Sequence, residues 1–511
     1  MRLAGAVPAA FAGYDWAYLT AACPRGLLFP RPQPPGEDSV KIGLSLGGLT
    51  VCGLAVVLGS TSATALSGRG GDGGLAAGPD VIVGSIPDWG KYGVATFNGE
   101  QWIAYAVGST SCNIGTQQLQ WVPSPGSNQH PVIPQNMYRL KGGRFEQIGM
   151  SWTKHGFCAL QQTLCGACTP AGGGCPTVLG IGCSDPYTWS LNGDQGDLGP
   201  RSIINASTGY FVANWSNPSS SDPSTLKERL RVRVADLDPA QNAGALYYAE
   251  AQYVHPQDAA SQNDDNNASY RRFTVGAWST TGYSIAFSGA TIQQQPAIYA
   301  WPLTNADALV REYDVTGDGR YILGYRVSDN GNGTWHYEFS VLNLNSDRSG
   351  GSFSIPVGSG VTVTNIGFKD VDYHSGEPYA NTDWTGAYAS GAVTWNSPQT
   401  HAQNPNSNAL RFATMYNFRF DANTAPQAAS VTLGLFKPSA TGPATIAMAA
   451  KGPSAYVPPC AATDLNCDAT VDGADLTMLM ANWGGPGVGD VDSSGVVDGS
   501  DLATLLASWS N

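Results

Sequence analysis

The chain has 511 residues, a formal net charge of −13 and 13% charged residues, with 63 glycines, 14 tryptophans and 22 tyrosines. An acidic chain without a run of lysines or arginines lacks a surface for phosphate groups, which argues against a nucleic-acid partner. The length allows two to four domains, and the abundance of turn-forming and aromatic residues is typical of β-rich extracellular proteins.

An export signal is predicted over residues 40–65. Lys41 precedes an apolar run from Ile42 to Leu58, and the small residues Ala63-Thr64-Ala65 follow it. A charged start, an apolar stretch and a small-x-small site are the parts of a secretory signal, with cleavage expected after Ala65. The alternative is a membrane-spanning helix, for which this glycine-containing run is short. We therefore expect a secreted, cell-surface-associated protein with no membrane span after signal cleavage.

The segments on either side of this signal are expected to lie outside the folded part. Residues 1–39 contain proline and arginine without periodicity, and the simplest interpretation is that Val40 is the initiator and 1–39 a misassigned leader. Residues 66–79 are rich in glycine, which predicts a flexible leader. The folded body then begins near Asp80.

Residues 80–225 are predicted to form a cysteine-rich β module, in which short apolar segments alternate with glycine and asparagine turns. An even number of cysteines in an exported chain indicates disulfides. The spacing of Cys165 and Cys168 also leaves a metal site or a redox pair open, although no second C-x-x-C follows. The six cysteines of this region are Cys112, Cys158, Cys165, Cys168, Cys175 and Cys183.

Two histidines of the same region, His130 and His155, lie near the acidic Glu146 in the sequence. A histidine with a nearby acid can act as a general base or as a copper or zinc ligand. Neither a nucleophile motif nor an H-E-x-x-H pattern accompanies them, so structural histidines are the other interpretation.

Residues 226–437 change to longer segments in which apolar and polar residues alternate, as in Trp335–Val341. Alternation with period two predicts half-buried strands, and such strands broken by Asn-Gly and Asp-Gly turns predict an antiparallel β-sandwich. The segment Asp314–Gly319 copies the first half of a calcium loop but lacks an acid at position 12, so we interpret it as a turn.

The most suggestive polar constellation of the body comprises Asp370, Asp372 and His374, with Glu377 beyond them. If residues 370–374 form a strand, side chains at i, i+2 and i+4 share one face. Paired carboxylates among aromatic residues are used by glycosidases, and clustered aspartates also bind calcium. The third interpretation is a polar outer face that ends in a turn. The four residues are therefore candidates for catalysis or for metal binding.

The C-terminal repeat, residues 460–511, follows a proline-, alanine- and glycine-rich stretch over 438–459 that is expected to be a linker. Oxygen-bearing residues recur after 26 residues at positions 1, 3, 5, 9 and 12 of two loops, with a backbone carbonyl expected at position 7. This is the ligand set that one short loop offers to a calcium ion with 6–8 oxygen ligands. The first loop comprises Asp464, Asn466, Asp468, Thr470, Asp472 and Asp475, and the second comprises Asp490, Asp492, Ser494, Val496, Asp498 and Asp501.

Each loop leads into an apolar pattern with helical spacing. Four carboxylates in one loop repel one another until a divalent cation neutralises them, and so small a domain lacks the core to fold easily unaided. We therefore expect calcium binding and folding of the repeat to be coupled. The apolar positions are Leu476, Leu479 and Trp483 after the first loop, and Leu502, Leu505 and Trp509 after the second.

This repeat resembles a type I dockerin, the duplicated calcium module that binds cohesin domains in secreted bacterial assemblies. The resemblance implies two calcium sites and a cohesin-like partner. The sequence departs from the usual pattern at Ala469, where calcium loops favour glycine, and at Ser494, where a carboxylate would be a stronger ligand. Cys460 and Cys467 flank the entry to the first loop and are positioned to form a disulfide. The residues before position 12 are small in both loops, which leaves the identity of the cohesin open.

The body resembles the ectodomains that precede dockerins in secreted, dockerin-anchored bacterial proteins, through stretches such as Ser111–Gly115, Asn343–Arg348 and Asp372–Tyr379. This resemblance implies export and anchoring but no activity. The expected fold is mainly β: a cysteine-containing β/loop module and an antiparallel β-sandwich, followed by a small α-helical domain with duplicated calcium loops.

Three functions follow from these observations. The first is a calcium-binding protein whose body is a binding or structural ectodomain anchored through the repeat. The alternative is an extracellular carbohydrate-degrading enzyme of the glycoside hydrolase type, docked in a multi-enzyme complex, with polysaccharide as its ligand. The third is a copper- or zinc-dependent oxidoreductase that uses His130 and His155.

Overall fold

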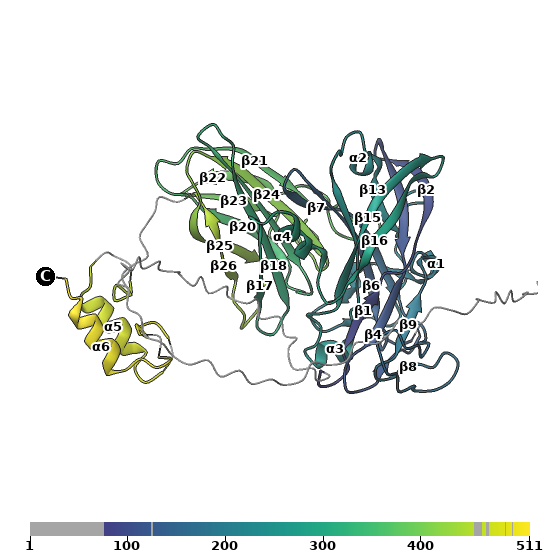
Figure 1. Cartoon of the computed structure of the whole chain (residues 1–511), viewed down its shortest axis with the longest axis horizontal. Coiled ribbons are helices and arrows are strands. Elements are labelled where there is room, and N and C mark those ends of the chain that lie inside the picture. The colour runs from purple at the N-terminus through teal and green to yellow at the C-terminus, as the bar shows by residue number, and fades with distance from the viewer. Residues whose placement is uncertain are drawn as a thin grey trace, which may run out of the picture. The chain divides into compact units, whose positions relative to one another are not determined.

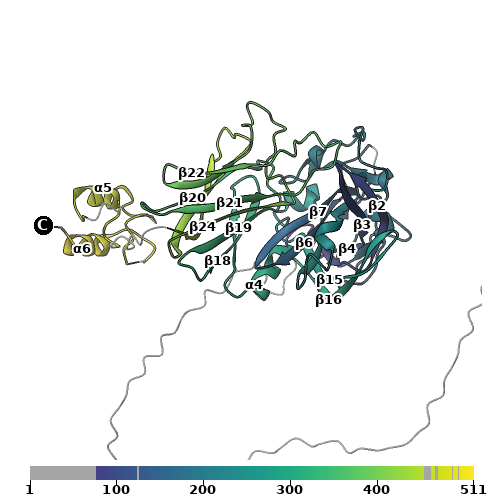
Figure 2. The same ribbon diagram turned by 90° about the horizontal axis from the view of Figure 1, so that it is seen from above.

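The computed structural model describes most of the chain between Ala76 and Ser510. Strands make up 43% and helices 11%, which confirms the prediction of a mainly β protein (Figures 1 and 2). No helix in the described part of the chain is long and apolar enough to cross a membrane. The described residues are 76–123, 126–453, 462–466, 470–485, 487–492 and 494–510. The predictions for residues 1–39, for the export signal 40–65 and for Cys460, Cys467, Asp468 and Ala469 concern residues outside these ranges.

A nine-stranded antiparallel sheet forms the frame of the first part of the body. Its central strands are buried on both faces, and β3 is covered over most of its length from Trp102 to Val107. In spatial order the strands are β16 (Gly282–Ile292), β15 (Ala268–Ser279), β14 (Leu246–Gln252), β6 (Val132–Lys141), β7 (Arg144–His155), β13 (Leu230–Arg233), β3 (Glu100–Val107) and β2 (Trp89–Phe97), and β10 (Leu198–Gly199) also pairs with β7.

A three-stranded sheet of β1 (Val81–Ser85), β4 (Ser109–Asn113) and β9 (Ser184–Tyr187) shares one hydrophobic core with the large sheet. Val81 and Tyr187 from the small sheet belong to the same cluster as Ile103 and Met137 from the large one. The remaining short elements are β5 (Leu119–Gln120), β8 (Val178–Leu179), β11 (Ile204–Asn205), β12 (Tyr210–Phe211), α1 (Trp189–Asn192), α2 (Val234–Leu237), α3 (Pro256–Ala260), α4 (Ala300–Thr304) and the 3-10 helices η1 (Gln195–Asp197), η2 (Arg201–Ile203) and η3 (Ala297–Tyr299).

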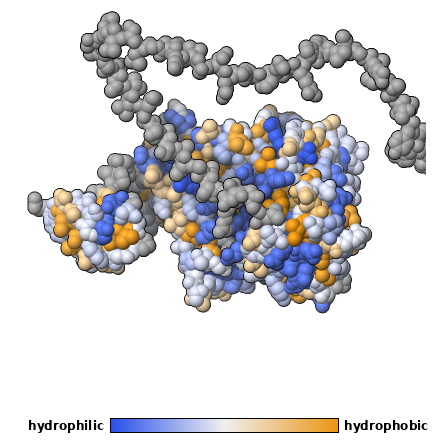
Figure 3. All heavy atoms as spheres, turned by 60° about the horizontal axis from the view of Figure 1, so that its bottom comes forward, coloured by the Kyte–Doolittle hydropathy of each residue, from blue (hydrophilic) through white to orange (hydrophobic). Residues whose placement is uncertain are grey.

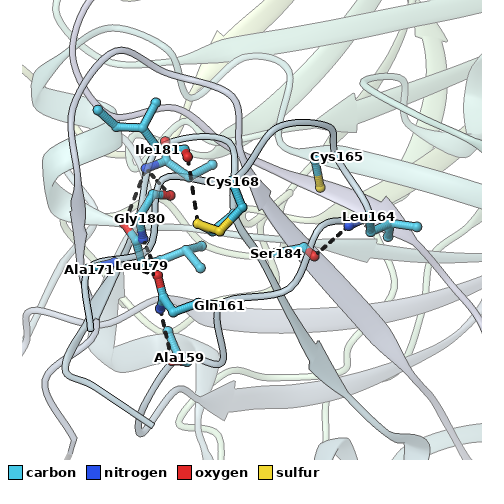
Figure 4. The surroundings of a disulfide bond; sticks show 12 residues. Ala159, Gln161, Leu164, Cys165, Cys168, Ala171, Leu179, Gly180, Ile181 and Ser184 are labelled. Carbon is cyan, nitrogen blue, oxygen red and sulfur yellow. Dashed lines mark hydrogen bonds between the residues drawn. A yellow bond between two sulfur atoms is a disulfide. The ribbon is translucent and has the colours of Figure 1, made fainter. Parts of the chain in front are cut away.

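Three disulfides staple the loops around the small sheet, which confirms that the six cysteines pair. The two cysteines of the C-x-x-C spacing bond to different partners, so they form neither a redox pair nor two thiolate ligands of a metal site. Between the loops, the Gln161 side chain accepts hydrogen bonds from the N–H groups of Ala171 (3.1 Å) and Gly180 (2.9 Å) (Figure 4). These bonds satisfy backbone groups in a region with few strands. The disulfides are Cys112–Cys165, Cys158–Cys175 and Cys168–Cys183.

Two five-stranded antiparallel sheets pack against each other in the second part of the body, as in a β-sandwich. Phe353 of one sheet contacts Phe418 of the other, with ring centroids 4.7 Å apart. The turn predicted at Asp314–Gly319 is confirmed, because the N–H of Val315 donates to the carbonyl of Gly319 between two strands. One sheet has the order β17 (Leu309–Asp314), β18 (Arg320–Asp329), β19 (Trp335–Asn343), β24 (Thr414–Ala422), β21 (Val363–Lys369), and the other β22 (Thr385–Ala389), β23 (Ala392–Asn396), β20 (Gly350–Pro356), β25 (Gln427–Leu435), β26 (Thr445–Gly452).

The sheets do not divide where the sequence pattern changes at residue 226. Strands β13 to β16, from Leu230 to Ile292, hydrogen-bond into the same sheet as β2, β3, β6 and β7, so the division falls between β16 and β17. At the other end, β26 lies inside the stretch 438–459 that is expected to be a linker, and it pairs with β25 along its whole length. Sequence composition indicates where turns occur, but it does not determine with which other strand a given strand pairs.

Strand β19 is buried on both faces, unlike the half-buried strand that its alternation predicts. Tyr337 and Phe339 face the core of the sandwich. Glu338 and Ser340, on the other face, are also covered, because the hydroxyl of Ser340 donates to the carbonyl of Phe145 in β7 (3.1 Å). The polar face of this strand therefore forms part of a buried contact with the nine-stranded sheet.

Two helices belong to the C-terminal repeat, α5 (Gly473–Ala481) and α6 (Gly499–Ala507), and each occupies the same place in its 26-residue unit. Their hydrophobic contacts come from Val471, Leu479, Val497 and Leu505, all of which are buried. Trp483 and Trp509 lie beyond the helix ends with 46% and 38% of their surface exposed, so they do not continue the apolar helix face as the spacing predicts.

Candidate functional site

Both helices of the C-terminal repeat begin with the same capping box. Asp472 precedes α5 and accepts from the N–H of Ala474 (2.7 Å), and Asp498 precedes α6 and accepts from the N–H of Ser500 (2.8 Å). The backbone angles of the two capping residues agree within 2°, at φ −142°, ψ −160° and φ −141°, ψ −162°. An aspartate at this position satisfies free N–H groups and lies at the positive end of the helix dipole.

The carboxylates at position 12, Asp475 and Asp501, fold each loop back onto its helix. One oxygen of Asp475 accepts from the N–H groups of Leu465 (2.6 Å) and Asn466 (3.0 Å), and the other accepts from that of Asp472 (2.9 Å). Asp501 makes the same three bonds, to residues 491, 492 and 498, at 2.6, 3.1 and 2.9 Å. Hydrogen bonds from backbone N–H groups, first those of Asp472 and Asp498, lower the pKa of the two carboxyls, so both are charged at neutral pH.

The second loop brings three carboxylates to one point. Asp490, Asp492 and Asp501 each offer an oxygen, and these atoms lie within 4.8 Å of one another. Oxygens bound to one calcium ion at 2.3–2.6 Å are at most about 5 Å apart, so the three fit one ion. The Asp490 carboxylate also accepts from the N–H groups of Ser494 (2.9 Å) and Gly495 (2.8 Å). The donor set is purely oxygen and therefore suits calcium rather than a transition metal.

In the first loop, the equivalent positions are Asp464, Asn466 and Asp475, all of which are described, whereas Asp468 at position 5 lies outside the described residues. The second loop bonds to the segment after α5, because Gly484 donates to the carbonyl of Val497 (2.9 Å) and Val497 donates to that of Gly485 (3.0 Å). The first loop bonds to the segment after α6, because Ser510 donates to the carbonyl of Val471 (2.9 Å). Each loop is thus held against the end of the other unit's helix.

The candidates at 370–377 do not share a strand face. Strand β21 ends at Lys369, and residues 370–374 are irregular, so the predicted i, i+2, i+4 face does not form. Asp370 accepts from the amide of Asn408 (2.6 Å). Asp372 pairs with Arg233, at a distance of 2.5 Å. Each carboxylate is bound to a different part of the fold.

His374 belongs to a fully buried network of its own. Its Nδ1 lies 2.9 Å from Oδ2 of Asp222, and its Nε2 lies 3.0 Å from the carbonyl of Met150. Arg231 completes the network at 2.8 Å from Asp222. Burial first, and then the positive charge of Arg231, lower the pKa of His374 to about 4.

Glu377 caps a short helix of the first part of the body. Its carboxylate accepts from the N–H groups of Arg201 (2.6 Å) and Ser202 (3.1 Å), at the start of η2. The guanidinium of Arg201 is itself buried and donates to the carbonyls of Ser151 (2.7 Å) and Ala413 (2.9 Å). These contacts give Glu377 a positioning role between the two parts of the body.

His130 and His155 are brought together in the core, with His130 Nε2 3.0 Å from His155 Nδ1. His130 Nδ1 lies 2.8 Å from the carbonyl of Val122 and donates to it, so its Nε2 accepts from His155. Burial lowers the pKa of His130 to about 4. Within the described residues, the acids of the second loop form the one group of three or more histidine, cysteine or acidic ligands that lie close enough for a metal ion.

A polar cavity of about 280 Å³ lies between the β6–β7 hairpin and strands β18 and β19. Arg144 Nε lies 2.8 Å from Glu338, which in turn is 3.2 Å from His336. Hydrogen bonding to Glu338, followed by that to Asp421, raises the pKa of His336. The sequence pattern had shown His336 and Glu338 only as the polar side of a strand. The lining residues are Arg139, Lys141, Gly142, Gly143, Arg144, Glu146, Arg326, Ser328, His336 and Glu338.

A scan against protein-family models gave no match to this chain, and a search of curated proteins gave none.

Proposed function

We propose that this protein is an exported, calcium-binding protein whose C-terminal repeat is a dockerin-like module that attaches the β-rich body to a cohesin-type receptor. In this proposal each loop binds one calcium ion, through Asp464, Asn466, Asp468, Thr470, Asp472 and Asp475 in the first loop and Asp490, Asp492, Ser494, Val496, Asp498 and Asp501 in the second.

The observation that carries the proposal is the duplication of one hydrogen-bond pattern. Asp475 and Asp501 accept bonds from equivalent backbone groups of their loops with nearly equal distances. A solvated acidic tail has no reason to repeat both a ligand spacing and the backbone geometry that orients the ligands. The three converging carboxylates of the second loop add the oxygen cluster that a calcium ion requires.

Apolar residues at equivalent positions of the repeat support the docking role. Met480 and Leu506 are each 50% exposed, and they are 26 residues apart. Trp483 and Trp509 are also exposed at equivalent positions, and Figure 3 shows apolar residues at the surface of this repeat. Exposed large apolar side chains on a small domain mark an interaction surface, and aromatic residues are enriched at such interfaces.

The disulfides of the body fit an exported protein, because such bonds persist in oxidising compartments. We assign the body a binding or structural role. The glycoside hydrolase alternative draws no support from Asp370, Asp372, His374 and Glu377, since each of these groups is engaged by a different part of the fold. A glycosidase needs two carboxyl groups that flank one bond of the substrate.

The test compares the full-length chain with a variant that carries Asp475→Asn and Asp501→Asn. After removal of metal with EGTA, the calcium bound at saturation is measured by equilibrium dialysis, and the helix content is followed by circular dichroism. We expect the variant to bind two ions fewer than the wild type and to lose the calcium-dependent gain in helix. Retention of the wild type on a panel of immobilised cohesins should require calcium and should be lost in the variant.

The matched control carries Asp307→Asn and Asp329→Asn, which remove the same charge from exposed positions of the body. It should bind as many ions as the wild type. A loop variant with undiminished calcium binding would refute the calcium sites. Normal calcium binding without retention by any cohesin would leave the calcium sites standing and refute the partner.

A further inference from the structure

A second group of oxygen ligands lies in the body, far from the C-terminal repeat in the sequence. Asp80 precedes β1 and is 1% exposed, and Asp258 lies in α3 and is fully buried. The loop between α3 and β15 contributes the sequence Asn263-Asp264-Asp265-Asn266-Asn267 beside them. The amide of Asn263 donates to the carbonyls of Ala77 (2.9 Å) and Pro79 (2.8 Å), which fixes the loop against the start of β1.

Two adjacent amides of this loop bind the two buried carboxylates. Asn266 Nδ2 donates to Oδ2 of Asp80 (3.3 Å), and Asn267 Nδ2 donates to Oδ2 of Asp258 (2.6 Å). The other oxygen of Asp258 accepts from the N–H of Val81 (2.9 Å), the residue that follows Asp80. The two carboxylates are therefore held on neighbouring donors of the same loop and the same strand end.

Three side-chain oxygens of this group have no hydrogen-bond partner among the described residues: Oδ1 of Asp80, of Asn266 and of Asn267. Asp80 and Asn267 are each 99% buried, because 1% of their surface is exposed. A buried acceptor without a donor costs about 1–3 kcal/mol, and a buried charge costs more, so such groups are rare unless something else satisfies them.

The two buried aspartates of this group also lack a counter-charge. None of the ion pairs within the described residues involves Asp80, Asp258 or Asp264. Burial, and then the nearby carboxylates of Asp80 and Asp264, raise the pKa of Asp258. Burial also raises the pKa of Asp80 to about 6. Asp80 and Asp258 are thus close enough to repel one another and have no lysine or arginine partner within the described residues, whereas Arg320 pairs with Asp265 (3.1 Å) of the neighbouring loop.

We propose that Asp80 and Asp258, together with the amide oxygens of Asn266 and Asn267, bind a calcium ion in the body. Carboxylate and amide oxygens without histidine or cysteine are the ligands of a hard cation, and calcium accepts such mixed, irregular sets better than magnesium does. One bound ion would satisfy the orphaned oxygens and supply the missing positive charge. It would also tie the start of β1, helix α3 and the start of β15 together.

This site is independent of the C-terminal repeat, so its test removes the contribution of the repeat. The full-length chain carrying Asp475→Asn and Asp501→Asn serves as the parent. Its thermal unfolding is followed by near-ultraviolet circular dichroism, in EGTA and at increasing CaCl2, with MgCl2 as the comparison. We expect Tm to rise by roughly 3–5 °C when calcium is about a hundredfold above its Kd, and to rise less with magnesium.

The variant Asp80→Asn separates a metal ligand from a merely structural residue. In EGTA its Tm should equal or exceed that of the parent, because a buried and uncompensated charge is removed. In calcium its Tm should fall below that of the parent, because the stabilisation by the ion is lost. A structural role would lower Tm equally in both conditions. The matched control is Asp185→Asn, another buried aspartate with an orphaned oxygen and a raised pKa, which should keep the full calcium response.

A second measurement keeps the proposal open to refutation if the Asp80→Asn variant does not fold. Amide hydrogen exchange of residues 255–268 in the parent protein should slow at least tenfold when calcium replaces EGTA. An unchanged exchange rate, an unchanged Tm of the parent, or a full calcium response in Asp80→Asn would each overturn the site.

Discussion

The acidic residues of the C-terminal repeat and those of the body are satisfied in opposite ways. In the repeat, Asp475 and Asp501 are bound by backbone groups of their own loops, within ten residues along the chain. In the body, Asp222 meets His374 across 152 residues and Glu377 meets Arg201 across 176. Hydrogen-bond partners that are close in the chain produce a periodic sequence pattern, whereas partners that are distant in the chain produce no such pattern.

This difference also separates two roles for a carboxylate. Asp222 is neutralised by Arg231, and burial closes the network around it. In the second loop of the repeat, Asp490, Asp492 and Asp501 converge instead on one another. Acids that face cations complete the fold, and acids that face acids create a demand for a bound cation. The group around Asp80 resembles the repeat in this respect, although it lies in the body.

The largest expected effect comes from breaking the buried ion pair of the body. Two alternate residues of β13, Arg231 and Arg233, each pair with one aspartate. Asp222→Ala leaves both Arg231 and His374 buried without their partner, so the free energy of unfolding should fall by about 3–5 kcal/mol. Asp372→Ala removes the partner of Arg233, whose side chain is 31% exposed and also pairs with Glu100, so the loss should stay below about 1 kcal/mol.

Urea unfolding of the two variants measures this contrast directly. Neither substitution should alter calcium binding by the sites that we propose in the C-terminal repeat, since both lie in the body. Equal losses in the two variants would contradict the distinction between buried and partly exposed pairs. A large loss confined to Asp372→Ala would mean that the partly exposed pair, rather than the buried one, stabilises the fold.

The next effect concerns pH, and two histidines of the body should respond with opposite signs. The pKa of His374 is about 4 in the folded protein and about 6.5 in the unfolded chain. The unfolded state therefore binds more protons between these values, and stability is lost as the pH falls, by up to about 1.4 kcal/mol per pH unit. The pKa of His336 is raised by Glu338, so its contribution is present below pH 6.5 and is lost as the pH rises through the folded value.

Urea unfolding of His374→Gln and His336→Gln between pH 4.5 and 8 tests these signs. Relative to the wild type, the first variant should show a weaker loss of stability on the acid side. The second variant should lack the decrease in the free energy of unfolding that the wild type shows as the pH rises above 6.5. The differences between variant and wild type isolate each histidine from the buried aspartates, whose raised pKa values act in the opposite direction to that of His374. Parallel pH profiles for both variants would refute the assignment.

The features that could be predicted from the sequence are those that depend on local contacts, and the features that could not depend on distant contacts. In the repeat, the positions of the two helices were predictable, because helix formation depends on neighbours in the chain, but Trp483 and Trp509 lie beyond the helix ends. Pairing of the cysteines was predictable, but not the bond between Cys112 and Cys165, which spans 53 residues. The alternation in β19 predicted a strand but not the burial of Glu338, because that face is covered by β7.

The candidates of the body show the limit most clearly. Asp370, Asp372 and His374 are close in sequence, yet an irregular backbone after Lys369 sends them to different partners. The group around Asp80 corresponds to no local sequence motif, because its oxygen-bearing residues come from position 80 and from residues 258–267. Composition of the loop 263–267 was the one available signal.

The smallest expected effect is a gain of calcium affinity in the second loop. Ser494 stands at position 5, and its hydroxyl donates to the carbonyl of Val496 (3.1 Å), the expected ligand at position 7. Ser494→Asp replaces this donor by a fifth carboxylate and frees the carbonyl for the ion, so calcium should bind a few-fold more tightly to this loop because affinity rises with ligand charge. The same added charge increases the repulsion in the metal-free loop, so the helix content in EGTA should fall or stay equal.

Calcium titration of full-length Ser494→Asp measures both effects. The control is Ser500→Asp, at an exposed position outside the ligand set. An equal gain of calcium affinity in the two variants would mean that general electrostatic attraction, rather than ligation at position 5, sets the affinity. It would weaken the contrast between acids that bind a cation and acids that merely surround it.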